Sequence, residues 1–197
     1  MRRDLPLAAR NLPALIRERL RHDDSVLVAI DGAAGLGKTT LANILRREFP
    51  GQATVLHADD YLAERHERFA QRLIAYDPRA IDLEALRQDI NALSQGRDVI
   101  VRPYQHPTGT HSSPVVVPSR PLLIVEGAHT LTAPDHLIGV FIDGTENAMY
   151  HFRRERDVRE RHASPATFDT WWNGMNEDYH RYVEINRENA TVVTASR

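Results

Sequence analysis

Short apolar runs alternate along the chain with longer stretches in which apolar residues recur every three or four positions. The runs predict strands, and the spaced stretches predict helices. The expected strands cover residues 26–30, 54–57, 99–102, 122–125, 140–142 and 191–193. The expected helices cover residues 38–49, 83–95 and 146–161, with one ending near residue 21 and another starting after residue 164. Strands that alternate with helices predict an α/β fold with a parallel sheet covered on both faces.

Capping residues support three of these helix boundaries. Asp82, Thr145 and Ser164 stand where helix N-caps are expected, and Pro165 follows in the first turn of the last helix. That helix carries an aromatic stripe at helical spacing, which predicts core packing rather than a ligand site. The stripe consists of Phe168, Trp171, Trp172, Met175, Tyr179 and Tyr182.

Length and composition exclude several classes to which this protein could belong. The 197 residues suit a single domain, 1–197, with an N-terminal helix within 1–24. A formal net charge of −2 gives no basic field for a nucleic acid or a membrane surface. No apolar run reaches the ~18 residues of a membrane span. The absence of cysteine excludes disulfides and thiolate metal sites and fits a cytoplasmic location.

A glycine-rich segment indicates the cofactor. Residues 32–39, GAAGLGKT, match the phosphate-loop pattern G-x-x-x-x-G-K-[ST] between a predicted strand and a predicted helix. Backbone N–H groups and the helix N-terminus would face the phosphates, Lys38 would contact the β- and γ-phosphates, and Thr39 would ligate Mg²⁺. We therefore expect ATP and Mg²⁺, although the sequence does not distinguish ATP from GTP. The expected nucleotide-binding residues are Gly32, Gly35, Leu36, Gly37, Lys38, Thr39 and Thr40.

Motifs of other nucleotide-binding classes are missing from the sequence. A GTPase would carry N-K-x-D and usually D-x-x-G, and a transporter ATPase would carry a signature of the L-S-G-G-Q type. The chain has none of these. We therefore expect phosphoryl transfer to a small molecule, and the alternative from another class is a regulatory nucleotide-binding protein without transfer activity.

Acidic residues follow two of the predicted strands. Asp59 and Asp60 come after the strand at 54–57, and Glu126 follows the strand at 122–125. Parallel strands meet at their carboxyl ends, where open α/β sheets bind ligands. Asp59 is therefore a candidate base for an acceptor hydroxyl, and Glu126 is a candidate Mg²⁺ ligand. The alternative for each acid is a helix or turn cap.

Five arginines fall between residues 153 and 161, interleaved with three acids. Alone, this spacing is also typical of a salt-bridged surface helix. Beside a phosphate loop it favours a lid that brings positive charge to the transferred group and excludes water. We expect this lid at 153–164.

Together these segments resemble the uridine kinase / phosphoribulokinase family of P-loop kinases, which includes uridine–cytidine kinases and nicotinamide riboside kinases. GAAGLGKTT is similar to the family's glycine loop, HADDYL to its S-Q-D-[SD]-F-[YF] segment, and LLIVEG to its V-x-[VL]-E-G. YDPRAID resembles F-D-x-P-x-A-[FI]-D, and RRERDVRER resembles the lid pattern R-x-x-R-D-x-x-x-R-G. The likeness covers 26–193, and the last two segments are more specific than the loop.

The resemblance implies a fold and a set of roles. The fold is a five-stranded parallel sheet flanked by helices, like the core of nucleoside monophosphate kinases, with an Arg-rich lid. Asp59 would accept the proton of a nucleoside 5′-hydroxyl, with uridine or cytidine as the acceptor. Tyr76, Asp77 and Tyr104 would lie with Asp59 in the acceptor pocket, and Arg153, Arg156 and Arg161 would be lid arginines on phosphate and substrate, with catalytic roles for Arg156 and Arg161. Tyr61 and His111 are further candidates for contact with the acceptor. The oligomeric state stays open among a monomer, a homodimer and a homotetramer.

The departures from the family pattern lie on the acceptor side. After Tyr104 the family continues with Asp and Phe and then a His, whereas this chain continues with Gln-His-Pro in a segment, 104–119, that we expect to be a substrate-side insert. His-Ala at 162–163 replaces the Gly-Arg of the lid. Nicotinamide riboside, pantothenate and a sugar therefore remain alternative acceptors. His106 or His111 is a candidate to contact the acceptor, since the histidine spacing matches no zinc pattern.

Overall fold

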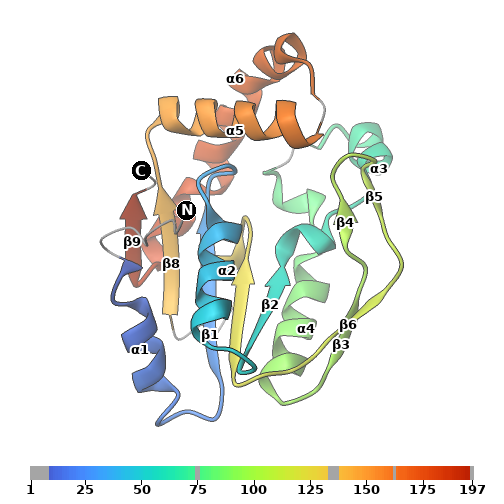
Figure 1. Cartoon of the computed structure of the whole chain (residues 1–197). Helices are drawn as coiled ribbons and strands as arrows, with labels where there is room; N and C mark the ends of the chain where they lie inside the picture. The colour runs from blue at the N-terminus through green and yellow to red at the C-terminus, as the bar shows by residue number, and fades with distance from the viewer. Residues whose placement is uncertain (1–8, 74–75, 133–137, 162, 196–197) are drawn as a thin grey trace.

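The computed structural model describes residues 9–73, 76–132, 138–161 and 163–195. Its centre is one parallel sheet with the strand order β2-β7-β1-β8-β9 (Figure 1). The strands are β1 Val26–Gly32, β2 Ala53–His57, β7 Leu122–Glu126, β8 Ile138–Asp143 and β9 Val192–Ala195. The predicted five-stranded parallel α/β fold is confirmed.

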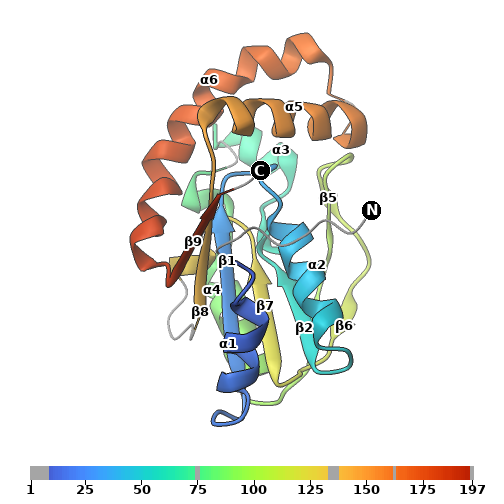
Figure 2. The same ribbon diagram turned by 60° about the vertical axis from the view of Figure 1, so that its left-hand side comes forward.

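Helices cover both faces of this sheet. They are α1 Leu12–Arg19, α2 Lys38–Glu48, α3 Arg65–Ala70, α4 Leu83–Ser94, α5 Glu146–Arg161 and α6 Pro165–Tyr182. Figure 2 shows α1 and α2 on one face and α4 on the opposite face, while α5 and the start of α6 cross above the carboxyl ends of the strands. Short 3₁₀ helices fill the connections: η2 Ala58–Tyr61, η3 Pro78–Ala80, η4 Thr130–Thr132 and η5 Glu184–Asn189. The carboxyl edge of the sheet therefore faces α5.

The predicted caps form. The side chain of Asp82 accepts from Ala85 N–H at 2.9 Å, and Ser164 Oγ accepts from Thr167 N–H at 3.1 Å. Each cap satisfies one backbone donor at a helix start, which has no partner within the helix itself. These local interactions explain why the helix starts could be read from the sequence.

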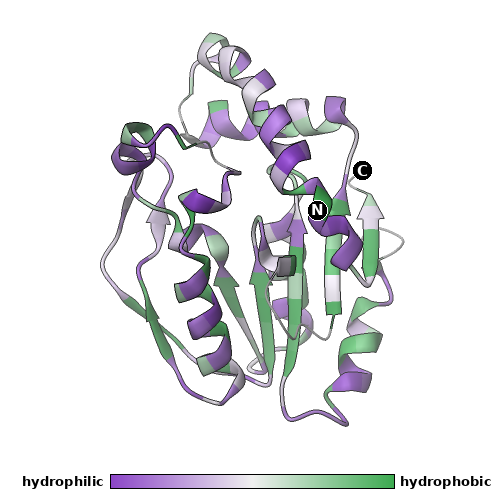
Figure 3. Cartoon of the chain, turned by 180° about the vertical axis from the view of Figure 1, so that it is seen from behind, coloured by the Kyte–Doolittle hydropathy of each residue, from purple (hydrophilic) through white to green (hydrophobic). Residues whose placement is uncertain are grey.

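The hydrophobic core surrounds the central strands. All seven residues of β1 are buried, because helices cover both of its faces. Figure 3 shows the apolar strands at the centre of the molecule and polar residues on the outer surfaces of the helices. Leu86, Ile90 and Leu93 of α4 are buried on the side that packs against the sheet. The core thus holds the carboxyl ends of the strands in fixed positions.

The strand expected at 99–102 lies outside the parallel sheet. β3 (Val99–Val101) pairs antiparallel with β6 (Val115–Val117), and β4 (Tyr104–Gln105) pairs antiparallel with β5 (Thr110–His111). The segment 104–119 is therefore the greater part of a long two-stranded ribbon. A run of β-branched residues predicts a strand but not its pairing direction, which is why the pattern did not distinguish this ribbon from a sheet strand.

The aromatic stripe of α6 packs only in part. Phe168, Met175 and Tyr179 are buried as expected, but Trp171 is 54% exposed, so its predicted core position is wrong. Tyr150 of α5 packs on the rings of Phe168 and Trp172. Among the residues that the structure describes, no helix is both long and apolar enough to span a bilayer.

Candidate active site

The phosphate loop connects β1 to α2 at the carboxyl edge of the sheet. Lys38 is the first residue of α2, and its Nζ donates to the carbonyl oxygens of Gly32 and Ala33 at 2.8 and 3.0 Å. These bonds hold the ammonium group over the start of the loop. The side chain that sequence analysis assigned to the phosphates is thus fixed beside the loop backbone.

The apex of the loop packs directly on α5. Gly35 has φ +90°, a left-handed conformation that favours glycine. A Cβ at this position would lie 2.9 Å from the backbone nitrogen of Arg153, so the two backbones touch only because Gly35 has no side chain. The loop and α5 therefore share one contact surface.

A buried carboxylate fixes the base of the loop. Asp31 is fully buried, and its Oδ1 accepts from Gly32 N–H at 2.7 Å. Its Oδ2 accepts from Leu131 N–H at 3.3 Å and from the Asn186 amide at 3.2 Å. Burial raises the pKa of Asp31. The carboxylate thereby ties β1, η4 and η5 together immediately before the loop.

Glu126 joins the phosphate loop to the second strand. Its Oε1 accepts from the Thr39 hydroxyl at 2.9 Å and lies 2.7 Å from His57 Nδ1. The parallel pairing of β2 with β7 places His57 directly opposite Glu126. The hydrogen bond to this carboxylate raises the pKa of His57. The Thr39 hydroxyl and the Glu126 carboxylate are oxygen donors of the kind that Mg²⁺ prefers, so the residues fit the ion.

The two acids of η2 have different environments. Asp60 Oδ1 accepts from Tyr104 N–H at 2.9 Å, and burial raises the pKa of this carboxyl group. The Asp59 side chain is 48% exposed, and its Oδ2 lies 2.9 Å from Nε2 of His106. Asp60 therefore fastens the ribbon to η2, and Asp59 is the acid that a solvent-borne molecule can reach.

Tyr104 is the centre of a small cluster beside these acids. Its ring packs edge-to-face on His106 and His111, with centroids 5.1 and 5.4 Å apart. Arg68 Nη2 donates to the Tyr104 hydroxyl at 2.7 Å. Nε2 of His111 lies 3.1 Å from the carbonyl oxygen of Asp60. The cluster brings together the predicted acceptor residues Tyr104 and His111 with the predicted base.

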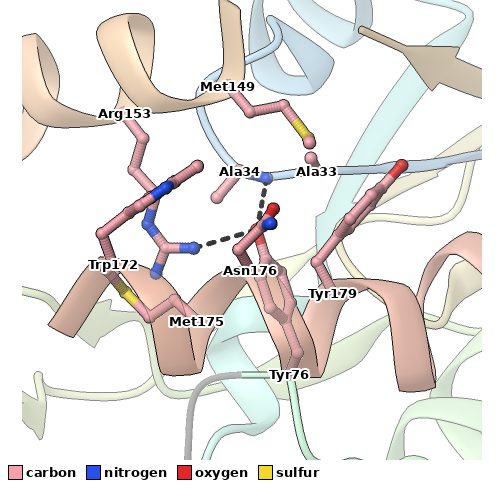
Figure 4. A pocket seen from close by; sticks show the side chains of 9 residues that line it. All are labelled: Ala33, Ala34, Tyr76, Met149, Arg153, Trp172, Met175, Asn176 and Tyr179. Carbon is pink, nitrogen blue, oxygen red and sulfur yellow. Dashed lines mark hydrogen bonds between the residues drawn. The ribbon is translucent and has the colours of Figure 1, made fainter. Parts of the chain in front are cut away.

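Tyr76 connects the loop to α5 (Figure 4). Its hydroxyl accepts from Ala34 N–H at 2.7 Å and from Arg153 Nη1 at 3.0 Å. Tyr76 is 5% exposed and Arg153 is 4% exposed. Trp172 and Tyr179 of α6 line the same small cavity. These two predicted acceptor residues thus form a buried joint between the nucleotide loop and the predicted lid helix.

Two further predicted acceptor residues have protein partners. The Tyr61 hydroxyl donates to Asp89 Oδ2 at 2.6 Å, and burial together with this acid raises the pKa of Tyr61. Asp77 is 6% exposed, and Nε of Arg79 donates to its Oδ1 at 3.0 Å. The Arg79 hydrogen bonds lower the pKa of Asp77. Contact of either side chain with an acceptor stays a prediction.

The predicted lid arginines lie on α5. Arg156 Nη2 donates to Asp157 Oδ1 at 2.7 Å, and Nε of Arg153 lies 3.6 Å from Oδ2 of the same carboxylate. One acid thus holds two of the arginines. Arg161 ends the helix, but its side chain, like His162, lies outside the described part of the structure. The segment 153–164 as a moving lid stays a prediction.

Some residues of the site had no role assigned from the sequence. Asp31 interrupts an otherwise apolar strand immediately before the loop, and that carboxylate was the available signal. His57 and Arg68 gave no such signal, because their partners are 69 and 36 residues away in the chain. Such contacts are visible only once the ribbon and the sheet are placed in space.

Comparison with known proteins gives consistent results. The Phosphoribulokinase / Uridine kinase family matches residues 27–196. A phosphoribulokinase of Synechocystis sp. is 29% identical over 180 residues, which cover 87% of this chain and 53% of the relative. A uridine kinase of Staphylococcus epidermidis is 25% identical over 181 residues and covers 87% of both chains. This chain spans about half the length of the phosphoribulokinases that it matches.

A solved structure has the same fold. The structure of a possible uridine kinase from Bacillus stearothermophilus superposes with a TM-score of 0.64 at 22% identity, covering 93% of this chain and 97% of that one. The family match covers most of the sequence and includes the phosphate loop, the acids at the strand ends and all but the first residue of the five-stranded parallel sheet. The chain therefore belongs to the phosphoribulokinase / uridine kinase family.

Proposed function

We propose that the chain is an ATP-dependent kinase that transfers the γ-phosphoryl group to a hydroxyl of a small molecule. The observation that carries the proposal is a continuous link from the phosphate loop to the candidate base. Thr39 donates to Glu126, Glu126 contacts His57, and Asp59 lies two residues further along the chain. Nucleotide-side and acceptor-side groups therefore meet at one edge of the sheet, as an in-line transfer requires.

The nucleotide side rests on the loop 32–40. In the proposal, the loop's backbone donors surround the phosphates, and Lys38 contributes a charge to the β- and γ-phosphates. Thr39 and Glu126 hold Mg²⁺, which neutralises phosphate charge when it is bound. The buried contacts of Asp31 keep the loop in this shape before any nucleotide arrives.

The acceptor side rests on Asp59. Its carboxylate orients the acceptor hydroxyl and takes its proton as the oxygen attacks phosphorus. Arg156 and Arg161, at the far end of α5, contribute positive charge to the phosphoryl group in transfer. Asp157 holds Arg156 in the present structure, so the arginine must exchange this carboxylate for the phosphoryl group.

A nucleoside such as uridine or cytidine is the acceptor that we favour. Support comes from the uridine kinase relative, which matches over 87% of its own length. A specific observation favours the second candidate, another small alcohol such as nicotinamide riboside, pantothenate or a sugar. His106 contacts Asp59 instead of extending toward the position expected for a nucleobase. The aromatic residue that the family pattern has after Tyr104 is also missing.

The test is ADP release from MgATP across a panel of acceptors. The panel contains uridine, cytidine, adenosine, nicotinamide riboside, pantothenate, ribulose 5-phosphate and simple sugars. We expect one acceptor to raise the rate far above the acceptor-free background, and Asp59→Asn to abolish the increase. Asp60→Asn is the matched control, because an asparagine oxygen can still accept from Tyr104 N–H.

Measurements of nucleotide affinity distinguish a kinase from a regulatory nucleotide-binding protein. If MgATP binds, Lys38→Ala weakens this binding, and no acceptor stimulates ADP release, the chain is a regulatory nucleotide-binding protein and the kinase proposal is wrong. If an acceptor stimulates release but Asp59→Asn does not reduce it, the kinase class stands and the assigned base is wrong.

A further inference from the structure

The tip of the β4–β5 hairpin carries a histidine that reaches back to the candidate base. Nε2 of His106 lies 2.9 Å from Asp59 Oδ2, across 47 residues of sequence. The His106 side chain is 29% exposed, so most of it is shielded from solvent. The contact joins the ribbon to η2 at the position where the acceptor hydroxyl is expected.

The hairpin holds this histidine in place from several sides. The His106 ring packs edge-to-face on Tyr104, with centroids 5.1 Å apart. Arg65 of α3 donates to the carbonyl oxygen of His106 and, at 3.3 Å, to that of Pro107. Gly109 N–H donates to Gln105 O at 2.7 Å and closes the turn. A ring fixed in this way costs little further entropy when it orients its partner.

We infer that His106 is a positioning residue for phosphoryl transfer: it donates Nε2–H to Asp59 Oδ2 and so fixes the carboxylate that takes the proton of the acceptor hydroxyl. The inference rests on the proposed kinase function. Asp59 is 48% exposed, and an aspartate without a fixed partner would rotate among rotamers. The hydrogen bond also stabilises the charged carboxylate, which is the form that accepts a proton. This histidine stands two residues after Tyr104, where the family pattern has an aromatic residue.

The chemical step needs no additional reactant. The acceptor oxygen forms a bond to the γ-phosphorus while its O–H bond breaks and the proton moves to the Asp59 carboxylate. The bond from the γ-phosphorus to the bridging oxygen breaks, and its electron pair leaves with ADP. His106 keeps its Nε2 proton throughout, so its role is to fix the carboxylate and its charge.

The charged surroundings of His106 determine the expected pH behaviour. Asp59 contacts the His106 ring, and Arg65 donates to the backbone carbonyl oxygen of His106. His111 packs on Tyr104, the same ring on which His106 packs. Loss of the hydrogen bond would make the charged form of the Asp59 carboxylate less stable. The acidic limb of the kcat/KM profile should then move to higher pH.

Two variants of His106 distinguish the contribution of its hydrogen-bond donor from that of its ring packing. His106→Phe keeps a ring against Tyr104 but has no donor, and His106→Gln keeps an amide donor without an imidazole. We expect kcat to fall about 10- to 100-fold in the Phe variant, within the range of general acid–base effects, with KM for MgATP unchanged. The Gln variant should recover most of kcat. His66→Gln, on an exposed face of α3 where the side chain is 74% exposed, is the control and should match the parent.

A second measurement does not depend on an acceptor. The ring nitrogen resonances of His106 are recorded by NMR in the parent and in Asp59→Asn, with His66 as internal reference. We expect the Nε2 resonance of His106 to move when Asp59 is replaced, because its hydrogen-bond partner at 2.9 Å changes, whereas an unchanged resonance overturns the pairing. Parent-like kcat and pH profile in His106→Phe overturn the inference while the kinase function stands. A parent enzyme that no acceptor stimulates overturns the proposed function and this inference together.

Discussion

Replacing Tyr76 by phenylalanine tests the joint between the phosphate loop and α5. The variant removes one oxygen atom that accepts from Ala34 N–H at 2.7 Å and from Arg153 Nη1 at 3.0 Å. The ring remains, and with it the cation–π contact of Arg153, whose Cζ lies 5.1 Å from the ring centroid. The loss is therefore confined to two hydrogen bonds.

The size of the effect follows from the burial of the two donors. Leaving one buried donor without an acceptor costs about 1–3 kcal/mol, and more when the group is charged. Arg153 is 4% exposed, whereas Ala34 is partly exposed and can recover a bond to water. We expect Tyr76→Phe to lower the free energy of unfolding by about 2–4 kcal/mol in urea denaturation at neutral pH.

Tyr179 provides the matched control. It lines the same cavity and packs edge-to-face on Tyr76, with centroids 6.0 Å apart. Its buried hydroxyl finds no hydrogen-bond partner within the described residues. Tyr179→Phe should therefore be neutral or stabilise by up to about 1 kcal/mol. Equal effects of the two variants, or a loss below about 0.5 kcal/mol for Tyr76→Phe, would refute the reasoning.

Three further predictions address other parts of the site. Gly35→Ala should push the loop away from the Arg153 backbone and weaken MgATP binding in calorimetry far more than it lowers the midpoint of thermal unfolding; parent-like affinity contradicts this. Arg79 lowers the pKa of Asp77 in the folded state, so its stabilisation is present above the ordinary pKa and is lost as pH falls through the folded one. Arg79→Gln should therefore be less stable than the parent at pH 7 in urea, with the difference vanishing in acid; a pH-independent difference would show that the ion pair is not its cause. Ser164→Ala should cost about 1 kcal/mol in the same assay, because the α6 N-cap is lost, and no change would mean that the cap contributes nothing.

The sequence pattern predicted those features of the fold that depend only on residues close together in the chain. The loop at 32–39, the strands of the sheet and the caps at Asp82 and Ser164 are each set by a few consecutive positions, and the structure confirms them. The order of the strands and the antiparallel direction of β3 depend on contacts between distant segments. An apolar run satisfies either arrangement, so these features could not be read from the pattern.

The candidate site likewise contains residues whose positions could be predicted from the sequence and residues whose contacts could not. Glu126 and Asp59 could be placed at the sheet edge because residues that follow parallel strands gather there. The burial of Arg153 could not be predicted, because its spacing among acids matches an exposed helix equally well. Nor could the contact of His106 with Asp59, since it depends on how far the ribbon folds back over η2.

The contacts of Asp31 have a consequence for the order of events during synthesis. The carboxylate lies next to the loop, yet its partners Leu131 and Asn186 come 100 and 155 residues later. A nascent chain emerges from its N-terminus, so the glycine motif leaves the ribosome long before the segments that anchor it. The loop therefore gains its last Asp31 anchor only after nearly all of the chain has emerged. A fragment that ends before Asn186 carries the whole motif but lacks one of its anchors.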